Sequence, residues 1–220
     1  MSAGRLRGRY AIHFGGVACG EERWSLERSA DGEVATGEQV TRAPFPFPST
    51  LEWRARTDRD ARLAALEVRW RVGERVVEAR HGADGERWRV RIEHQGHVRE
   101  QEGDYPARAH VVLGSHLFHT FVFRTLVLEP GAEHTAPMLA VGPPWLAVDP
   151  GRLVLRCTEA RPIETPLGVR DARRIEVVDP ARGRAEAFAA WIDADDIVLA
   201  SHEGEGDARP WMTLVELDRD

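Results

Sequence analysis

Lysine and asparagine are missing from this sequence of 220 residues, and all 30 of its basic residues are arginine. A chain without lysine cannot form the Schiff base of a pyridoxal phosphate enzyme, and it cannot supply the lysine of a phosphate-binding P-loop. The composition excludes both enzyme classes. The plentiful alanine, glycine and proline, together with arginine in place of lysine, are typical of a GC-rich bacterial genome.

Cysteine is nearly absent, and long apolar runs are missing altogether. Cys19 and Cys157 match no metal-binding or redox spacing, so we expect two free thiols in a reducing compartment. No stretch approaches the roughly 20 apolar residues of a membrane span, and Met1 to Phe14 lacks the apolar run of a secretory signal. The sequence therefore predicts a cytoplasmic protein without a transmembrane segment.

A basic stripe is also lacking. The net charge is -6, and arginine and glutamate alternate along the chain instead of gathering by sign. Because nucleic-acid binding needs a concentrated positive surface, we expect no nucleic-acid partner. The hydrophobic fraction of 42% is that of a folded protein, and the length suits one large β domain over residues 1–220.

The strongest pattern present is alternation of apolar and charged residues with a period of two, which is typical of half-buried strands. It is clear around Trp24, over Leu51 to Arg56, over Leu66 to Val72 and over Arg87 to Glu93. It resumes after Arg152 and continues to Leu217. Turn-forming pairs such as Asp84-Gly85 fall between these segments, as in an antiparallel meander.

One segment departs from this pattern. Behind Ser115, a residue suited to cap a helix, apolar side chains recur at helical spacing up to Leu126. The sequence predicts one helix here, with a buried strand over Thr120 to Leu128 as the alternative. The proline-rich stretches 44–48 and 129–150 are interpreted as extended connections.

The apolar faces of so many strands need a cover, and one helix about 10 Å wide cannot cover a sheet of ten strands spaced about 4.8 Å apart. We therefore predict a mainly β fold in which a large antiparallel meander curls into an open or half barrel, with the helix inside or across it. A β sandwich with a filled core is the alternative.

In this arrangement, the segments Trp53 to Ile92, Ser115 to Leu126, and Trp191-Ile192-Asp193 through Val198 resemble the half-barrel lipid carriers. That group comprises the periplasmic lipoprotein-carrier proteins and their relatives, including families described as glycolipid binders. The resemblance covers most of the chain and implies an apolar ligand held in a half-open barrel. A role in lipoprotein transport does not carry over, because Met1 to Phe14 does not form a signal peptide.

These observations lead to three hypotheses on function. The first is non-enzymatic binding or carriage of a hydrophobic small molecule or lipid in the barrel, without a cofactor or metal. The second is a cavity enzyme of the isomerase or cyclase type with His116 or His119 as base, and the third is a structural or interaction protein with a filled core. The side chains predicted to line a ligand site are aromatic: Trp24, Trp53, Trp70, Trp88, Phe118 and Phe121.

Overall fold

The computed structural model describes residues 4–107, 109–126, 128–178, 188–203 and 210–220. They form one sheet and one helix. The strands are β1 (Gly4–Phe14), β2 (Val17–Ser29), β3 (Gly32–Thr41), β4 (Thr50–Thr57), β5 (Leu63–Val72), β6 (Arg75–Asp84), β7 (Arg87–His94), β8 (His97–Asp104), β9 (His110–Val112), β10 (Glu133–Val141), β11 (Val148–Thr165), β12 (Gly168–Val178), β13 (Phe188–Ile192), β14 (Val198–Glu203) and β15 (Pro210–Arg219). The helix α1 (His116–Arg124) lies between β9 and β10 in the chain.

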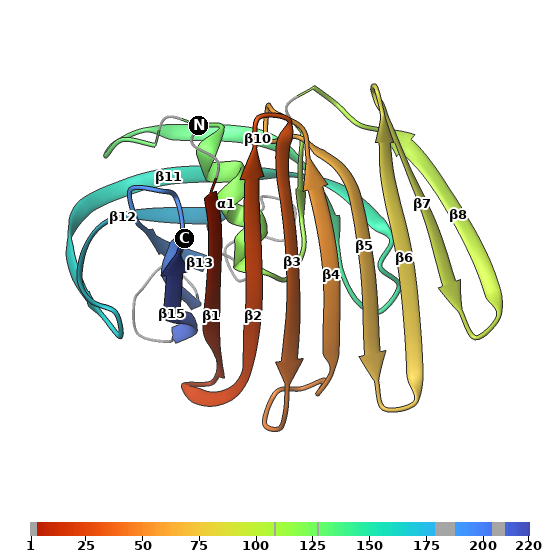
Figure 1. Cartoon of the computed structure of the whole chain (residues 1–220), viewed down its shortest axis with the longest axis horizontal. Helices are drawn as coiled ribbons and strands as arrows, with labels where there is room; N and C mark the ends of the chain where they lie inside the picture. Colours follow the sequence, from red (N-terminus) through yellow and green to blue (C-terminus); the bar gives the residue numbers. More distant parts are fainter. Residues whose placement is uncertain (1–3, 108, 127, 179–187, 204–209) are drawn as a thin grey trace.

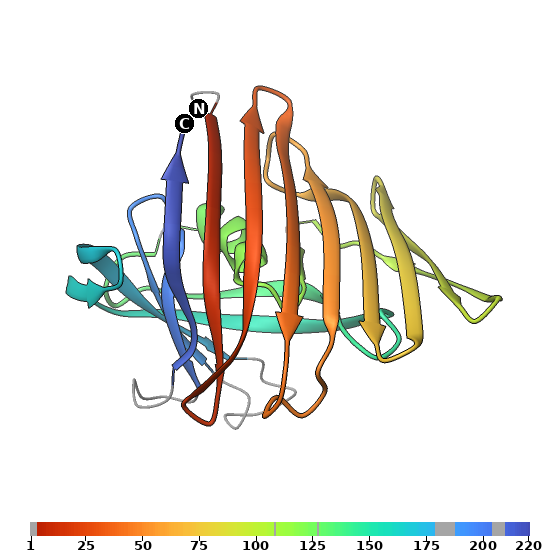
Figure 2. The same cartoon turned by 60° about the horizontal axis from the view of Figure 1, so that its bottom comes forward.

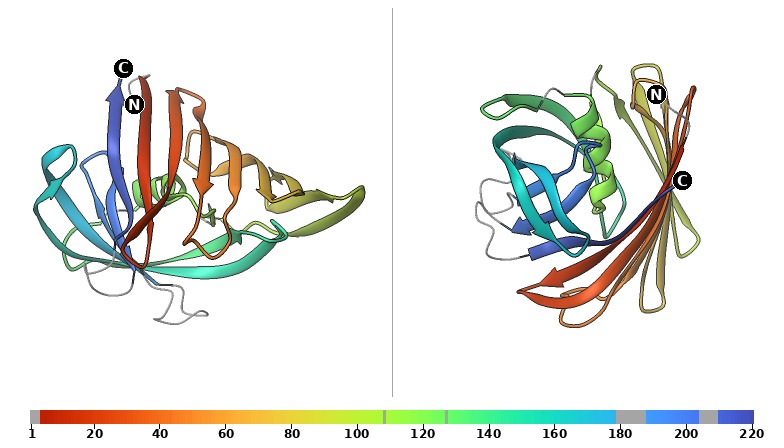
Figure 3. Two further views of the ribbon diagram at one scale, coloured as in Figure 1. Left: turned by 90° about the horizontal axis from the view of Figure 1, so that it is seen from below. Right: turned by 60° about the vertical axis from the view of Figure 1, so that its left-hand side comes forward.

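The 15 strands form a single sheet in which β1 pairs with β15, so that the two termini lie side by side (Figures 1 and 2). From β1 the sheet runs through β2 to the edge strand β8, and from β15 it runs back through β14 to the edge strand β9. Every pairing is antiparallel except that of β9 with β10. The sheet curls around α1 as a half barrel (Figure 3), so the predicted fold class is confirmed.

The helix begins after Ser115, whose hydroxyl accepts a hydrogen bond from the Leu117 amide at 3.2 Å. This is the predicted N-cap, so the prediction of a helix behind Ser115 is confirmed and the alternative strand over Thr120 to Leu128 is wrong. The capping bond and the apolar sheet surfaces on both sides of this segment favour a helix over a strand. Eight of its nine residues are buried.

The expectation of an extended connection over residues 129–150 is wrong in part, because Glu133–Val141 forms β10. Pro137 lies outside the three residues of β10 that pair with β9. Prolines are tolerated where a strand lacks a neighbour on one side, since no ladder hydrogen bond is lost there. The connection with Pro143, Pro144 and Trp145 follows the strand, as the sequence suggests.

The core fills both sides of α1. Phe118 and Phe121 pack against β1 to β7, whereas Val122 and Phe123 pack against β10 to β14. Both cysteines are buried free thiols, as predicted. No helix in the described parts of the chain is long and apolar enough to cross a bilayer.

Candidate functional site

A row of polar side chains crosses the inner face of the sheet opposite the beginning of α1. Tyr10 on β1 is paired with Glu22 on β2, and Glu22 is paired with Gln39 on β3. The Gln39 amide donates to the Gly114 carbonyl at 3.1 Å, which attaches the segment before the helix to the sheet. The row and Ser115 therefore form a polar cluster inside an apolar core.

Glu22 is the most unusual member of this cluster, because its side chain is 0% exposed and no cation among the described residues lies beside it. Burial raises the pKa of this carboxyl to about 8. The side chains of Ser115, Gln39 and Trp53 face it and lower its pKa, but by less than burial raises it. At neutral pH the group is mainly a neutral acid, which can donate a hydrogen bond as well as accept one.

Several neighbouring donors are buried without a hydrogen-bond partner among the described residues. They are the Tyr10 hydroxyl and the indole N–H groups of Trp24 and Trp53, and both carboxyl oxygens of Glu22 lack a hydrogen bond of normal geometry as well. Burial raises the pKa of Tyr10 well above its ordinary value, so it remains a phenol. Because buried polar groups are nearly always paired, these unpaired donors and acceptors set the cluster apart from the rest of the core.

The two histidines predicted as candidate bases lie in the first turn of the helix. His116 Nε2 lies 2.5 Å from Ser201 Oγ on β14, and the ring stacks against Phe188. Burial lowers the pKa of His116 well below its ordinary value and that of His119 to about 4. Both rings are neutral at pH 7, and His116 is only 1% exposed. The structure thus places them in the core, and their role as bases stays a prediction.

Most of the aromatic side chains predicted to line a ligand site meet around the helix. The indoles of Trp24 and Trp53 lie over Gly8 and Gly37, where a Cβ atom would come within 2.3 Å of either ring. Trp53 contacts Phe118 with 5.0 Å between ring centroids, and Phe118 contacts Phe121 at 5.9 Å. These four side chains fill the space between sheet and helix.

Trp88 and Trp70 complete the predicted set. Trp88 is buried against Tyr105 and donates to His81 Nδ1 at 3.3 Å, on the side of the sheet nearer its edge. Trp70 is only partly buried and packs at the margin of the same core. Whether any of the six contacts a ligand stays a prediction.

An open pocket of about 670 Å³ lies at the other end of α1. Its walls come from the turn between β4 and β5, from the segment around β9, from the end of the helix and from β10. Ala61, Ala107, Ala109, Leu126, Ala136 and Pro137 supply its apolar surface, and Asp60, Arg62, His110, Thr125, His134 and Thr135 supply its polar groups.

The polar groups of this pocket are held in place by their neighbours. Arg62 donates to the Tyr105 carbonyl at 2.8 Å, and its guanidinium carbon lies 3.9 Å from the centre of the Tyr105 ring. His110 Nε2 lies 3.3 Å from the Thr125 hydroxyl, and burial lowers the pKa of His110 to about 4. Arg62 is therefore a fixed cation beside the apolar walls of the pocket.

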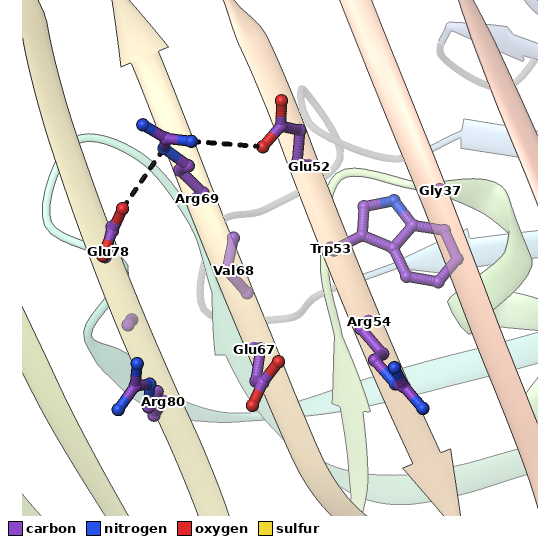
Figure 4. A pocket seen from close by; sticks show the side chains of 10 residues that line it. Gly37, Glu52, Trp53, Arg54, Glu67, Val68, Arg69, Glu78 and Arg80 are labelled. Carbon is purple, nitrogen blue, oxygen red and sulfur yellow. Dashed lines mark ion pairs between the residues drawn. The ribbon is translucent and has the colours of Figure 1, made fainter.

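The outer face of the sheet carries shallower grooves. In one of about 300 Å³, Arg69 lies between Glu52 and Glu78 at 3.9 and 3.2 Å (Figure 4). The indole of Trp53 lies behind these strands beside Gly37. These charged rows match the solvated faces that the alternation predicts, and exposed pairs of this kind are worth little energy.

Three functional groups were not singled out from the sequence: Glu22, Tyr10 and Arg62. A signal existed for Glu22, because it shares strand parity with the buried Trp24 and Leu26 and therefore faces the core. Nothing comparable distinguishes Arg62 from the other arginines. Within the described ranges, no three His, Cys, Asp or Glu side chains are grouped so that they could hold a metal ion.

The described residues form a curled β sheet around a single helix. Comparisons with known proteins show a similar fold and do not establish a function. No family model matches the chain, and no curated protein matches it. A crystal structure of a DUF1089 family protein from Pseudomonas aeruginosa is similar, with a TM-score of 0.56 and 17% identity over 86% of this chain and 91% of that one. A provisionally assigned lipoprotein from Parabacteroides distasonis matches with a TM-score of 0.33 and 9% identity, over 99% of this chain and 96% of that one.

Proposed function

We propose that the protein binds an amphipathic small molecule, such as a fatty acid or another lipid with an acidic head, without catalysis. The observation that carries this proposal is the pocket of about 670 Å³ between the end of α1, β10 and the turn after β4. Its size lies in the range of small-molecule sites, and such sites combine mostly apolar walls with a few placed polar groups.

The walls of the pocket suit the apolar tail of such a ligand, and Arg62 suits its acidic head. Ala107, Leu126 and Pro137 offer aliphatic surface that is not buried in the core, and covering this surface with an alkyl chain is favourable. Arg62 is held against Tyr105, so its guanidinium loses little freedom when it pairs with a carboxylate. The ligand proposed for this pocket would lie at the end of the helix, outside the cluster of aromatic rings.

The proposal is tested by calorimetric titration with dodecanoate, using dodecanol as the uncharged partner. Ala107 lines the pocket and is exposed, so Ala107→Trp fills the space without disturbing the core. We expect this variant to weaken dodecanoate binding about tenfold or more, which corresponds to about 1.4 kcal/mol. Ala30→Trp is the matched control, because Ala30 is an exposed alanine in the turn before β3 and does not line the pocket.

The head-group preference is tested separately with Arg62→Gln. We expect this change to weaken dodecanoate binding while leaving the affinity for dodecanol nearly unchanged, since only the carboxylate pairs with the guanidinium. Absence of saturable binding to the native protein, or binding that Ala107→Trp leaves intact, would overturn the proposal.

A further inference from the structure

Exposed apolar side chains gather at one end of the half barrel. Among the described residues, the exposed large hydrophobic side chains are Phe14, Val17, Phe47, Val98, Trp145 and Val169. All but Val169 lie in or next to the β1–β2, β3–β4 and β7–β8 connections or the loop after β10. These hairpins point the same way, toward the lower edge in Figure 1.

Contacts between side chains join these loops in two groups at the same end of the sheet. The rings of Phe14 and Phe45 meet edge to face with their centroids 5.8 Å apart, which connects the first hairpin to the second. Trp145 lies 6.1 Å from His94 at the end of β7, which brings the loop after β10 to the same end. We call Phe14, Val17, Phe45, Phe47, Val98 and Trp145 the apolar rim.

The backbone presents these side chains outward. Gly15 and Gly16 both have positive φ, 59° and 80°, and make the tight turn that sets Phe14 opposite Val17. In the next loop, phenylalanines alternate with prolines from Pro44 to Pro48, and Phe47 is 70% exposed. Exposed apolar groups clustered in this way mark a surface that binds another protein or a membrane.

The charges beside the apolar rim indicate which kind of partner it binds. Arg42 lies in the loop that carries Phe45 and Phe47, and Arg71 and Arg75 flank the neighbouring β5–β6 turn. All three are exposed and form no ion pair with a described residue, and Glu74 lies in the turn between Arg71 and Arg75. Glu93, which lies nearby on β7, is already paired with Arg91 at 3.0 Å.

We propose that the apolar rim docks on the surface of an anionic lipid bilayer. Phenylalanine and tryptophan side chains at hairpin tips enter the interfacial region, where aromatic rings are favoured. The three arginines then lie at the level of the head groups, where each cation gains from the negative surface potential. The protein as a whole carries -6, so this attraction is local to the rim.

This surface is separate from the pocket of the proposed function. The pocket is lined by the turn between β4 and β5, which lies at the opposite end of the strands from the β3–β4 and β5–β6 hairpins. Docking and ligand binding can therefore succeed or fail independently.

Sedimentation with vesicles tests the docking. We expect the protein to pellet with vesicles of phosphatidylcholine and phosphatidylglycerol, to pellet less with phosphatidylcholine alone, and to be released by added salt. Phe47→Ser should weaken binding about tenfold, because a large apolar contact is lost. Arg42→Gln should weaken it about fivefold and reduce the salt dependence.

The matched control is Val169→Ser, since Val169 is 68% exposed but lies in the β11–β12 hairpin, outside the rim. It should bind anionic vesicles like the native protein. Failure of the native protein to bind these vesicles, or binding that Phe47→Ser leaves unchanged, would overturn the proposal. Concentration-dependent dimerisation that Phe47→Ser abolishes, without vesicle binding, would assign the rim to a second copy of the chain and overturn it equally.

Discussion

The two ends of α1 each face a buried glutamate, and the two glutamates have different partners. At the end of the helix, Glu33 on β3 lies within 2.5 and 2.7 Å of Arg124 Nη1 and within 3.0 Å of Arg28. At the beginning of the helix, Glu22 on β2 meets hydroxyl, amide and indole groups but no cation from the part of the chain that the structure describes. Both side chains are at most 4% exposed.

The difference lies in the partners that folding brings to two carboxyl groups of similar burial. Glu33 is held by two arginines, one of them at the helix end where the helix dipole also favours a cation. Glu22 has no such partner, so burial raises its pKa to about 8. One end of the helix is fastened by an ion pair and the other by neutral polar groups.

The largest expected effect comes from breaking the ion pair. Arg124→Gln removes the bidentate partner of Glu33 and leaves a buried carboxylate with Arg28 alone, so we expect a loss of about 3 kcal/mol in the free energy of unfolding. Urea denaturation near neutral pH measures it. Arg54→Gln is the control, because Arg54 is exposed and forms no ion pair with a described residue. A loss no larger than that of the control would show that the pair does not fasten the helix.

A smaller effect is expected from Glu22→Gln, and it depends on pH. Because the folded pKa of about 8 lies above the ordinary value of 4.5, the carboxyl stabilises the fold fully at low pH, and this contribution is lost as the pH rises through 8. From about pH 6.5 to about pH 8.5 the native protein should lose roughly 2 kcal/mol that the variant retains.

Urea denaturation at the two pH values measures this difference. The buried His110 and His119 do not titrate in this range, since burial lowers their pKa values to about 4. Parallel curves for the native protein and the variant would mean that Glu22 is ionised in the fold.

The smallest effect on the free energy of unfolding is expected on the outer face of the sheet, where the ion pairs are exposed to solvent. Arg69→Gln removes an exposed arginine from between Glu52 and Glu78, and we expect less than about 1 kcal/mol, diminished further by salt. Denaturation at low and high ionic strength checks this. A loss as large as that of Arg124→Gln would mean that exposure does not separate the two kinds of ion pair.

Much of the fold could be predicted because it is local. The alternation around Trp53 and Trp88 indicates strands, and the Ser115 cap followed by apolar residues at helical spacing indicates the helix. The excess of apolar strand face over helix then predicts a curled sheet, which the pairing of 15 strands bears out. The strand β10 escaped prediction because Pro137 within it and the prolines on both sides of it resemble a loop, and its pairing with β9 and β11 overrides that local signal.

The candidate site was less predictable, because its parts come from distant segments. Arg62 and the residues around His110 and Ala136 form one pocket only after β4, β9 and β10 have been placed around the end of α1. The aromatic side chains were identified as inward-facing, yet whether they line a cavity or fill a core depends on how closely the helix lies against them.

By itself, the sequence determined which side chains face inward, where the helix begins and that the sheet must curl, since strand parity, capping and the ratio of sheet to helix are properties of neighbouring residues. Only the tertiary structure decided that Glu33 meets Arg124, 91 positions away, while Glu22 faces the side chains of Ser115, Gln39 and Trp53. The physical reason is that the charge of a buried group depends on the atoms within a few ångströms of it, and the chain supplies those atoms from segments that only folding brings together.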